Sequence, residues 1–181
     1  MCSRRLAIVG AALGALATAC TTTGPSGPTS RPAFGRAATA QEVAAWDISI
    51  PPSGEGLPAG SGTPRQGEAV YVAKCQACHG EKGAGKPADE LAGGVGSLAS
   101  ANPVRTVGSY WPYATTLFDY TRRAMPVTNP LSLSSDEVYA VTAYLLYLNG
   151  IIGENEVMDA RALPQVKMPN RDGFVDWSRK Q

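Results

Sequence analysis

The sequence has little net charge, a single histidine and no apolar run that is long enough to cross a bilayer. Its formal charge of +1 excludes the strongly basic surface that nucleic-acid binding requires, so no nucleic-acid partner is expected. The apolar run at residues 6–16 falls short of the ~20 residues that a transmembrane helix needs. By contrast, 14 prolines and 20 glycines among 181 residues predict a loop-rich chain with one domain of ordinary size.

Cysteine and histidine, although scarce, meet in one C-x-x-C-H motif at residues 75–79. The spacing of Cys75 and Cys78 suits thioether bonds to the two vinyl groups of one haem, and His79 follows where its imidazole can bind the iron. A C-x-x-C pair also occurs in redox dithiols and in zinc sites. The other two cysteines lie within the first 20 residues, so the ligands fall short of a four-ligand zinc site, and no thioredoxin-like strand pattern surrounds the motif. The motif therefore predicts one covalently attached haem c and leaves no thiols for a disulfide scaffold.

The N-terminal part of the chain has the features of an export signal followed by a tether. Residues 1–19 combine two arginines, the apolar run and a small-residue cleavage region, which predicts a signal peptide. Cys20 then resembles the lipidated cysteine of a lipobox, with Ala17 in place of the usual large aliphatic residue. The alternative is ordinary cleavage that leaves a thiol. Residues 20–38, rich in Gly, Pro, Ser and Thr, predict a flexible tether, and the expected location is periplasmic or on the envelope side of the membrane, with a lipid on Cys20 as the membrane contact.

Residues 39–63 are predicted to form an N-terminal arm. A short helical pattern at residues 37–45 has Thr39 as its candidate N-cap. Residues 46–50 then alternate briefly in polarity, and the remainder is irregular and rich in Gly and Pro. The arm is expected to lie on the domain surface, or alternatively to dock on a partner protein.

The predicted haem domain covers residues 64–150 and contains three helices. The first, residues 64–75, has Gly67 on the same face as an aromatic residue, so that another helix can approach closely. The third begins with a capping box at Ser134 and ends in a left-handed cap at Gly150. Its expected buried stripe consists of Val138, Val141, Leu145 and Leu148. These two helices are expected to cross over the haem.

A second helix is predicted at residues 112–124 because Pro112 suits a first helical turn. Its expected apolar stripe consists of Tyr113, Leu117, Tyr120 and Ala124. We interpret this stripe as part of the core. In the alternative interpretation, Trp111 or Tyr113 donates a hydrogen bond to a haem propionate.

Met125 follows this helix directly and precedes Pro126, and a methionine thioether is a suitable sixth ligand for haem iron. Met158 and Met168 compete for this role, but both lie in the predicted C-terminal arm, residues 151–181, which shows no regular hydrophobic period. We therefore expect His79 and Met125 to be the two iron ligands. A core methionine is the alternative interpretation of Met125.

The haem motif, the Met-Pro dipeptide and the helix order resemble the all-α class I cytochrome c fold, here with extended arms at both ends. Longer strings resemble one family in particular. They are residues 46–48 (WDI), 56–62 (GLPAGSG), 107–117 (VGSYWPYATTL), 123–126 (RAMP), 138–144 (VYAVTAY) and 168–170 (MPN). The chain is similar, from about residue 34 to residue 174, to the cytochrome c subunit of Sox-type sulfur (sulfane) dehydrogenases and related sulfite dehydrogenases.

This resemblance implies an electron-transfer subunit without substrate chemistry of its own. A molybdenum-cofactor subunit would oxidise sulfite or another sulfur compound and donate electrons singly to the haem, and a downstream cytochrome or oxidase would accept them. The haem positions that carry over are Cys75, Cys78, His79 and Met125. One alternative is a free-standing lipoprotein cytochrome that shuttles electrons to a respiratory oxidase. Another is a haem sensor or enzyme with an open iron site, which requires Met125 to be away from the iron.

Overall fold

The structure of the protein is a computed structural model that describes residues 34–179. The predicted signal peptide at residues 1–19, Cys20 and the first part of the tether therefore lie outside the described residues. The chain divides after Thr39 into two units, and the second unit carries the helices and strands described below. Within residues 34–179, no helix combines the length and apolar character that crossing a membrane requires.

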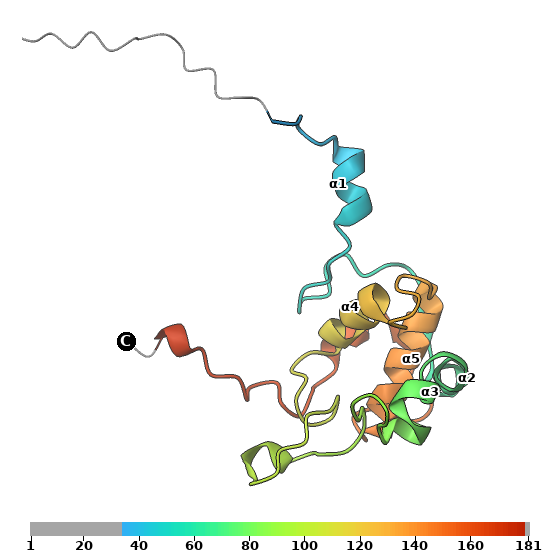
Figure 1. Cartoon of the computed structure of the whole chain (residues 1–181), viewed down its shortest axis with the longest axis vertical. Coiled ribbons are helices and arrows are strands. Elements are labelled where there is room, and N and C mark those ends of the chain that lie inside the picture. The colour runs from blue at the N-terminus through green and yellow to red at the C-terminus, as the bar shows by residue number, and fades with distance from the viewer. Residues whose placement is uncertain (1–33, 180–181) are drawn as a thin grey trace, which may run out of the picture. The chain divides into compact units, whose positions relative to one another are not determined.

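The second unit is all-α with little strand, as expected for the class I cytochrome c fold (Figure 1). Its α-helices are α1 (Ala40–Trp46), α2 (Pro64–Lys74), α3 (Gln76–His79), α4 (Ala114–Ala124) and α5 (Ser135–Leu148). Its short 3-10 helices are η1 (Glu81–Gly83), η2 (Ser97–Ala99), η3 (Leu163–Gln165) and η4 (Trp177–Arg179). Its two short strands are β1 (Ser61–Gly62) and β2 (Met158–Asp159).

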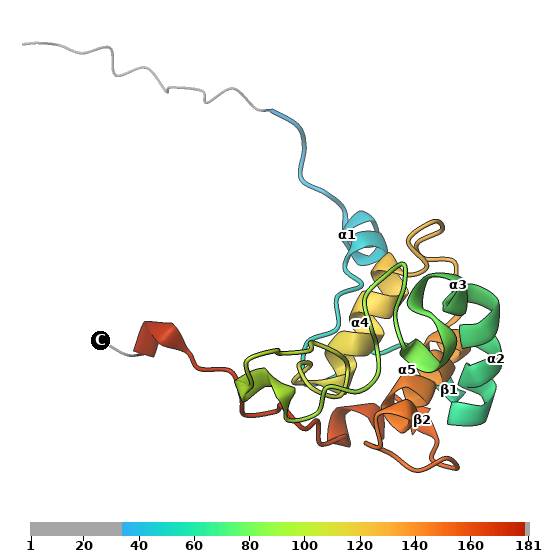
Figure 2. The ribbon, with the colours of Figure 1, turned by 60° about the horizontal axis from the view of Figure 1, so that its bottom comes forward.

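Helices α2 and α5 pack directly against each other, as the sequence predicted (Figure 2). An added Cβ at Gly67 would lie 2.4 Å from the carbonyl carbon of Ala140, so only glycine permits this crossing. The rings of Tyr71 and Tyr144 fill the crossing, with centroids 5.3 Å apart. The expected close approach at Gly67 is thus confirmed.

The ends of α2 and α5 are set by local hydrogen bonds. Ser134 and Glu137 form the predicted capping box of α5, and Gly150 follows the helix with a left-handed φ of 67°. Thr63 and Gln66 form an equivalent capping box at the start of α2. We did not predict this second box, although its T-x-x-Q spacing is a recognised signal.

Helix α4 differs from its prediction in both start and face. It begins at Ala114, two residues later than the predicted residues 112–124, because Tyr113 has an extended backbone and acts as the N-cap. Leu117 is buried as expected, but Tyr120 is 45% exposed, so the predicted stripe is wrong at this position. Phe118 instead enters the core and packs against Tyr139 of α5, with ring centroids 4.5 Å apart.

The N-terminal arm contains one helix and an extended segment that contacts the domain. Helix α1 is displaced by one to three residues from the predicted residues 37–45, and all seven of its residues are exposed. No strand forms at residues 46–50. Ile50 is buried instead, because the chain beyond α1 lies against α4.

The C-terminal arm has no long helix, yet it contributes to the core. Strand β2 pairs antiparallel with β1, with Gly62 opposite Met158. The arm buries four apolar side chains in the core, namely Met158, Leu163, Val166 and Met168. Their irregular spacing explains why the sequence shows no hydrophobic period in this region.

Candidate haem-binding site

The C-x-x-C-H motif forms a helical turn at the end of α2. Cys75 caps α2, with its backbone N–H donating to the Tyr71 carbonyl at 2.8 Å. The backbone N–H groups of Cys78 and His79 then both donate to the Cys75 carbonyl, at 3.1 and 3.0 Å. This turn presents two thiols and one imidazole together, which is the donor set that covalent haem attachment needs.

The Cys75 thiol differs from the nucleophile of a reactive dithiol. Both thiols of the motif are free, with Cys75 half-buried and Cys78 exposed. Burial raises the pKa of the Cys75 thiol from 9.0 to about 11. A catalytic C-x-x-C pair instead shows a lowered pKa, because its thiolate is the nucleophile. The environment of Cys75 therefore favours the haem interpretation over the redox interpretation.

The ring of His79 is oriented by a backbone carbonyl. Its Nδ1 lies 2.8 Å from the carbonyl oxygen of Asp89, and a carbonyl only accepts, so Nδ1 carries the proton. The lone pair is then on Nε2, the tautomer that a metal ligand requires. His79 thus fits the role of iron ligand.

The loop after the motif is folded back on the motif itself. The N–H of Gly85 donates to the His79 carbonyl at 2.7 Å, and the N–H of Ala88 donates to the Cys78 carbonyl at 2.9 Å. The hydroxyl of Tyr71 donates to the Gly80 carbonyl at 2.8 Å, and burial raises the pKa of Tyr71 to about 12. Because this hydroxyl stays protonated at neutral pH, it remains a donor.

Asn149, at the C-cap of α5, holds the segment that follows Asp89, whose carbonyl orients the His79 ring. Its Nδ2 donates to the carbonyls of Leu91, at 3.1 Å, and Leu145, at 2.8 Å. Its Oδ1 accepts from the N–H of Gly93 at 3.0 Å. Asn149 therefore ties α5 to the segment that follows Asp89. We predicted only a helix end at this position, since the contact joins residues 58 apart.

Met125 lies directly after α4, with an extended backbone at φ −118° and ψ 144°. Its N–H donates to the Thr121 carbonyl at 3.1 Å, and its side chain is half-buried. Met158 and Met168 are each 3% exposed within the apolar core. Met125 is therefore the most accessible methionine of the described residues, and its role as an iron ligand stays a prediction.

The aromatic residues before α4 contact other protein groups. The ring of Trp111 lies against Tyr120, with centroids 5.7 Å apart. The guanidinium of Arg171 lies over the ring of Tyr113, 4.5 Å from its centroid. Arg171 belongs to the C-terminal arm, and we did not predict this contact. A hydrogen bond from Trp111 or Tyr113 to a propionate stays a prediction.

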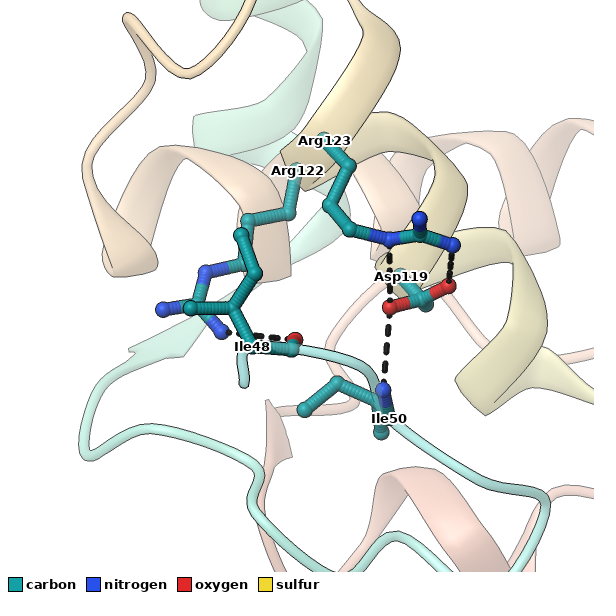
Figure 3. A network of polar contacts seen from close by, with 5 residues as sticks. All are labelled: Ile48, Ile50, Asp119, Arg122 and Arg123. Carbon is teal, nitrogen blue, oxygen red and sulfur yellow. Dashed lines mark hydrogen bonds and ion pairs between the residues drawn. The ribbon is translucent and has the colours of Figure 1, made fainter. Parts of the chain in front are cut away.

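A buried carboxylate connects the N-terminal arm to α4, as Figure 3 shows. Asp119 Oδ1 accepts from the N–H of Ile50 at 2.9 Å and from Nε of Arg123 at 3.0 Å, while Oδ2 accepts from Nη2 of Arg123. Arg122 Nη1 donates to the Ile48 carbonyl at 3.4 Å. The hydrogen bond to Asp119 also raises the pKa of Arg123. Both arginines that precede Met125 are thus engaged within the protein.

Comparison with known proteins identifies a protein family and a solved structure to which the chain is similar. Residues 62–145 match the model of the family described as cytochrome c oxidase, cbb3-type, subunit III. The crystal structure of the sulfane dehydrogenase SoxCD from Paracoccus pantotrophus contains a chain that is 42% identical, with a TM-score of 0.77. The match covers 83% of this chain and 75% of that chain. No curated protein sequence matches.

Proposed function

This chain belongs to the cytochrome c subunits of the Sox-type sulfane dehydrogenases, which are class I c-type cytochromes, and from this premise we propose its function. It transfers single electrons as the mono-haem, electron-accepting subunit of a molybdenum-dependent sulfite or sulfur-compound dehydrogenase. The cytochrome c domain is of a kind located in the periplasm or outside the cell. A downstream cytochrome or oxidase takes the electrons onward.

The main support for this proposal is the extent of the structural match. The match to the sulfane dehydrogenase chain covers 83% of 181 residues, or about 150 residues. The cytochrome family model covers only residues 62–145. The structural match therefore extends over about 65 residues beyond that region, in the segments that flank the haem domain. Flanking segments that are shared with a subunit of a dehydrogenase support a role in the same kind of assembly.

A cytochrome c domain carries covalently attached haem c, which supplies one-electron redox chemistry when bound. One C-x-x-C-H motif supports a count of one haem. In our proposal, the thiols of Cys75 and Cys78 would hold it covalently, and His79 and Met125 would be the ligands of its iron. Two protein ligands leave no iron position for a substrate, so the chain performs no substrate chemistry itself.

The test of this function uses sulfite as the reductant. The purified holocytochrome with sulfite alone is expected to stay oxidised on the timescale of turnover, and addition of the molybdenum-cofactor subunit is expected to reduce it rapidly. Absorption of the reduced haem gives the rate. Reduction by sulfite alone would favour an open-site enzyme. A failure of reduction with the partner present would favour a free-standing cytochrome that serves an oxidase.

The arms carry exposed aromatic side chains that suit a partner surface. Trp46 in the N-terminal arm is 87% exposed, and Trp177 in the C-terminal arm is 77% exposed. Tryptophan is enriched among the residues that dominate binding energy at interfaces. We infer that both arms dock on the molybdenum-cofactor subunit.

Replacing either tryptophan with alanine should therefore raise the cytochrome concentration at half-maximal reduction by about tenfold, the effect of a loss of about 1.4 kcal/mol. Tyr147→Ala, an exposed aromatic on α5, is the control and should leave this concentration unchanged. Point substitutions are preferable to truncation after Asn155, because the C-terminal arm supplies core side chains such as Met158 and Leu163. If wild type and both tryptophan variants had the same cytochrome concentration at half-maximal reduction, a docking role of the two tryptophans would be excluded.

We also propose that a lipid on Cys20 anchors the protein to the membrane. Cys20 follows small residues and precedes a tether-like segment, and it lies outside the described residues. The native protein should then fractionate with membranes, and Cys20→Ser should release it or block its processing without changing the haem spectrum. Mass spectrometry of the mature N-terminus checks this prediction. An unmodified Cys20, or cleavage at another position, would contradict it.

A further inference from the structure

Asp119 is an acidic residue that is buried, unlike the members of an ordinary surface ion pair. Its residue is 7% exposed, and both carboxylate oxygens accept hydrogen bonds. An Asp–Arg pair four residues apart on a helix forms without burial and contributes little. Burying a carboxylate is costly unless its hydrogen bonds are satisfied. A hydrogen bond that offsets this cost comes from the backbone N–H of Ile50, 69 residues away in the N-terminal arm.

Two further contacts extend this connection along α4. Thr115 Oγ1 donates to the Pro52 carbonyl at 3.2 Å, near the start of the helix. Arg122 Nη1 donates to the Ile48 carbonyl at 3.4 Å, in its last turn. The spacing of positions 115, 119 and 122 places all three side chains on one helix face. Residues 48–52, which we name the arm strap, therefore lie along α4 from its first turn to its last. Figure 3 shows the contacts of Ile48 and Ile50.

The arm strap contacts the last turn of α4, and this turn leads directly into Met125, the predicted iron ligand. The last turn of a helix has unpaired carbonyls and frays easily. Met125 is joined to this turn by its N–H bond to the Thr121 carbonyl, and Arg123 precedes it by two residues. A metal-ligating side chain keeps its position only when the residues that support it are themselves held in place. Fastening the last turn of α4 therefore fixes the backbone from which the Met125 thioether extends.

We propose that Asp119 is a positioning residue for Met125, acting by fastening the arm strap to α4, whose last turn leads into Met125. This inference rests on the proposed function, in which Met125 binds the haem iron. It gives the N-terminal arm a second role besides docking, because the arm that meets a partner is also the arm that steadies the iron ligand. Loosening the strap would let Met125 leave the iron more often while the haem stays attached through Cys75 and Cys78.

The test uses the full-length holocytochrome with its haem attached. Asp119→Ala removes the acceptor for Ile50 and for Arg123. It should weaken the far-red band of the sulfur–iron bond and speed carbon monoxide binding to the ferrous protein about tenfold, the factor expected when the hydrogen bond that ties Ile50 to a charged group is lost. Asp119→Asn keeps an oxygen for the Ile50 N–H and should give a smaller effect. It also serves as the milder variant if the alanine variant folds poorly.

The control is Glu137→Ala, which breaks the capping box of α5 and the ion pair to Lys74. It should lower thermal stability without changing the far-red band or carbon monoxide binding. If the Asp119 variants lost stability alone, as this control does, Asp119 would be only structural and the inference would be wrong. If wild type itself lacked the band and bound carbon monoxide freely, the assignment of Met125 would fail, and the inference with it.

Discussion

Met125→Ala is expected to leave the haem covalently attached, because in our proposal the thioether bonds come from Cys75 and Cys78. It should lower the reduction potential, since Met/His ligation raises it. The far-red sulfur–iron band should disappear, and the iron should become open to carbon monoxide. Potentiometric titration and absorption spectra of the purified holoprotein measure these changes. His79→Ala should be more damaging still, because the chain has no second histidine to replace it.

The two competing methionines provide controls, provided that they are replaced conservatively. Met158 and Met168 are buried in the core, so truncation to alanine would cost about 2–5 kcal/mol of folding free energy and would confuse the result. Met158→Leu and Met168→Leu conserve volume and should cost less than about 1.5 kcal/mol. Both should retain the far-red band. A band lost in Met168→Leu and retained in Met125→Ala would reverse our ligand assignment.

Gly67→Ala is expected to destabilise the fold by about 3 kcal/mol, at the upper end of the usual cost of overpacking. In an isolated helix, alanine is favoured over glycine by about 1 kcal/mol. Here the new Cβ would lie 2.8 Å from Cβ of Tyr144 and still closer to the backbone of Ala140. Because a backbone cannot move aside as a flexible side chain can, α2 and α5 would have to separate.

Denaturant unfolding of the holoprotein measures this loss, and the yield of covalent haem provides a second measure of folding. Gly153→Ala is a matched control. The nearest atom to its added Cβ is Oε1 of Glu156 at 3.3 Å, the end of a flexible side chain, so the variant should unfold at nearly the wild-type midpoint. An unchanged midpoint for Gly67→Ala would show that the helices have room to separate.

Features that depend on neighbouring residues were predictable from the sequence. The capping box at Ser134 and the left-handed cap at Gly150 are formed by hydrogen bonds and backbone angles within one helical turn. The C-x-x-C-H motif is similarly local, since the covalent chemistry of a haem needs that spacing. The glycine at position 67 indicated a close helix crossing because few other constraints retain glycine in a helix. The family resemblance rested on longer strings and agrees with the structural match.

Features that join distant parts of the chain were decided by the tertiary structure. Tyr120 lies on the exposed side of α4, because the face of the helix that packs into the core carries Phe118 and Leu117. The helical period of the sequence is compatible with either of these overlapping faces and does not show which one is buried. The C-terminal arm enters the core through irregularly spaced residues, which no periodic pattern can indicate. Asp119 bonds to Ile50, 69 residues away, and Asn149 bonds to Leu91, 58 residues away. The sequence shows which polar side chains can form hydrogen bonds, but only packing brings a donor and its acceptor within about 3 Å of each other.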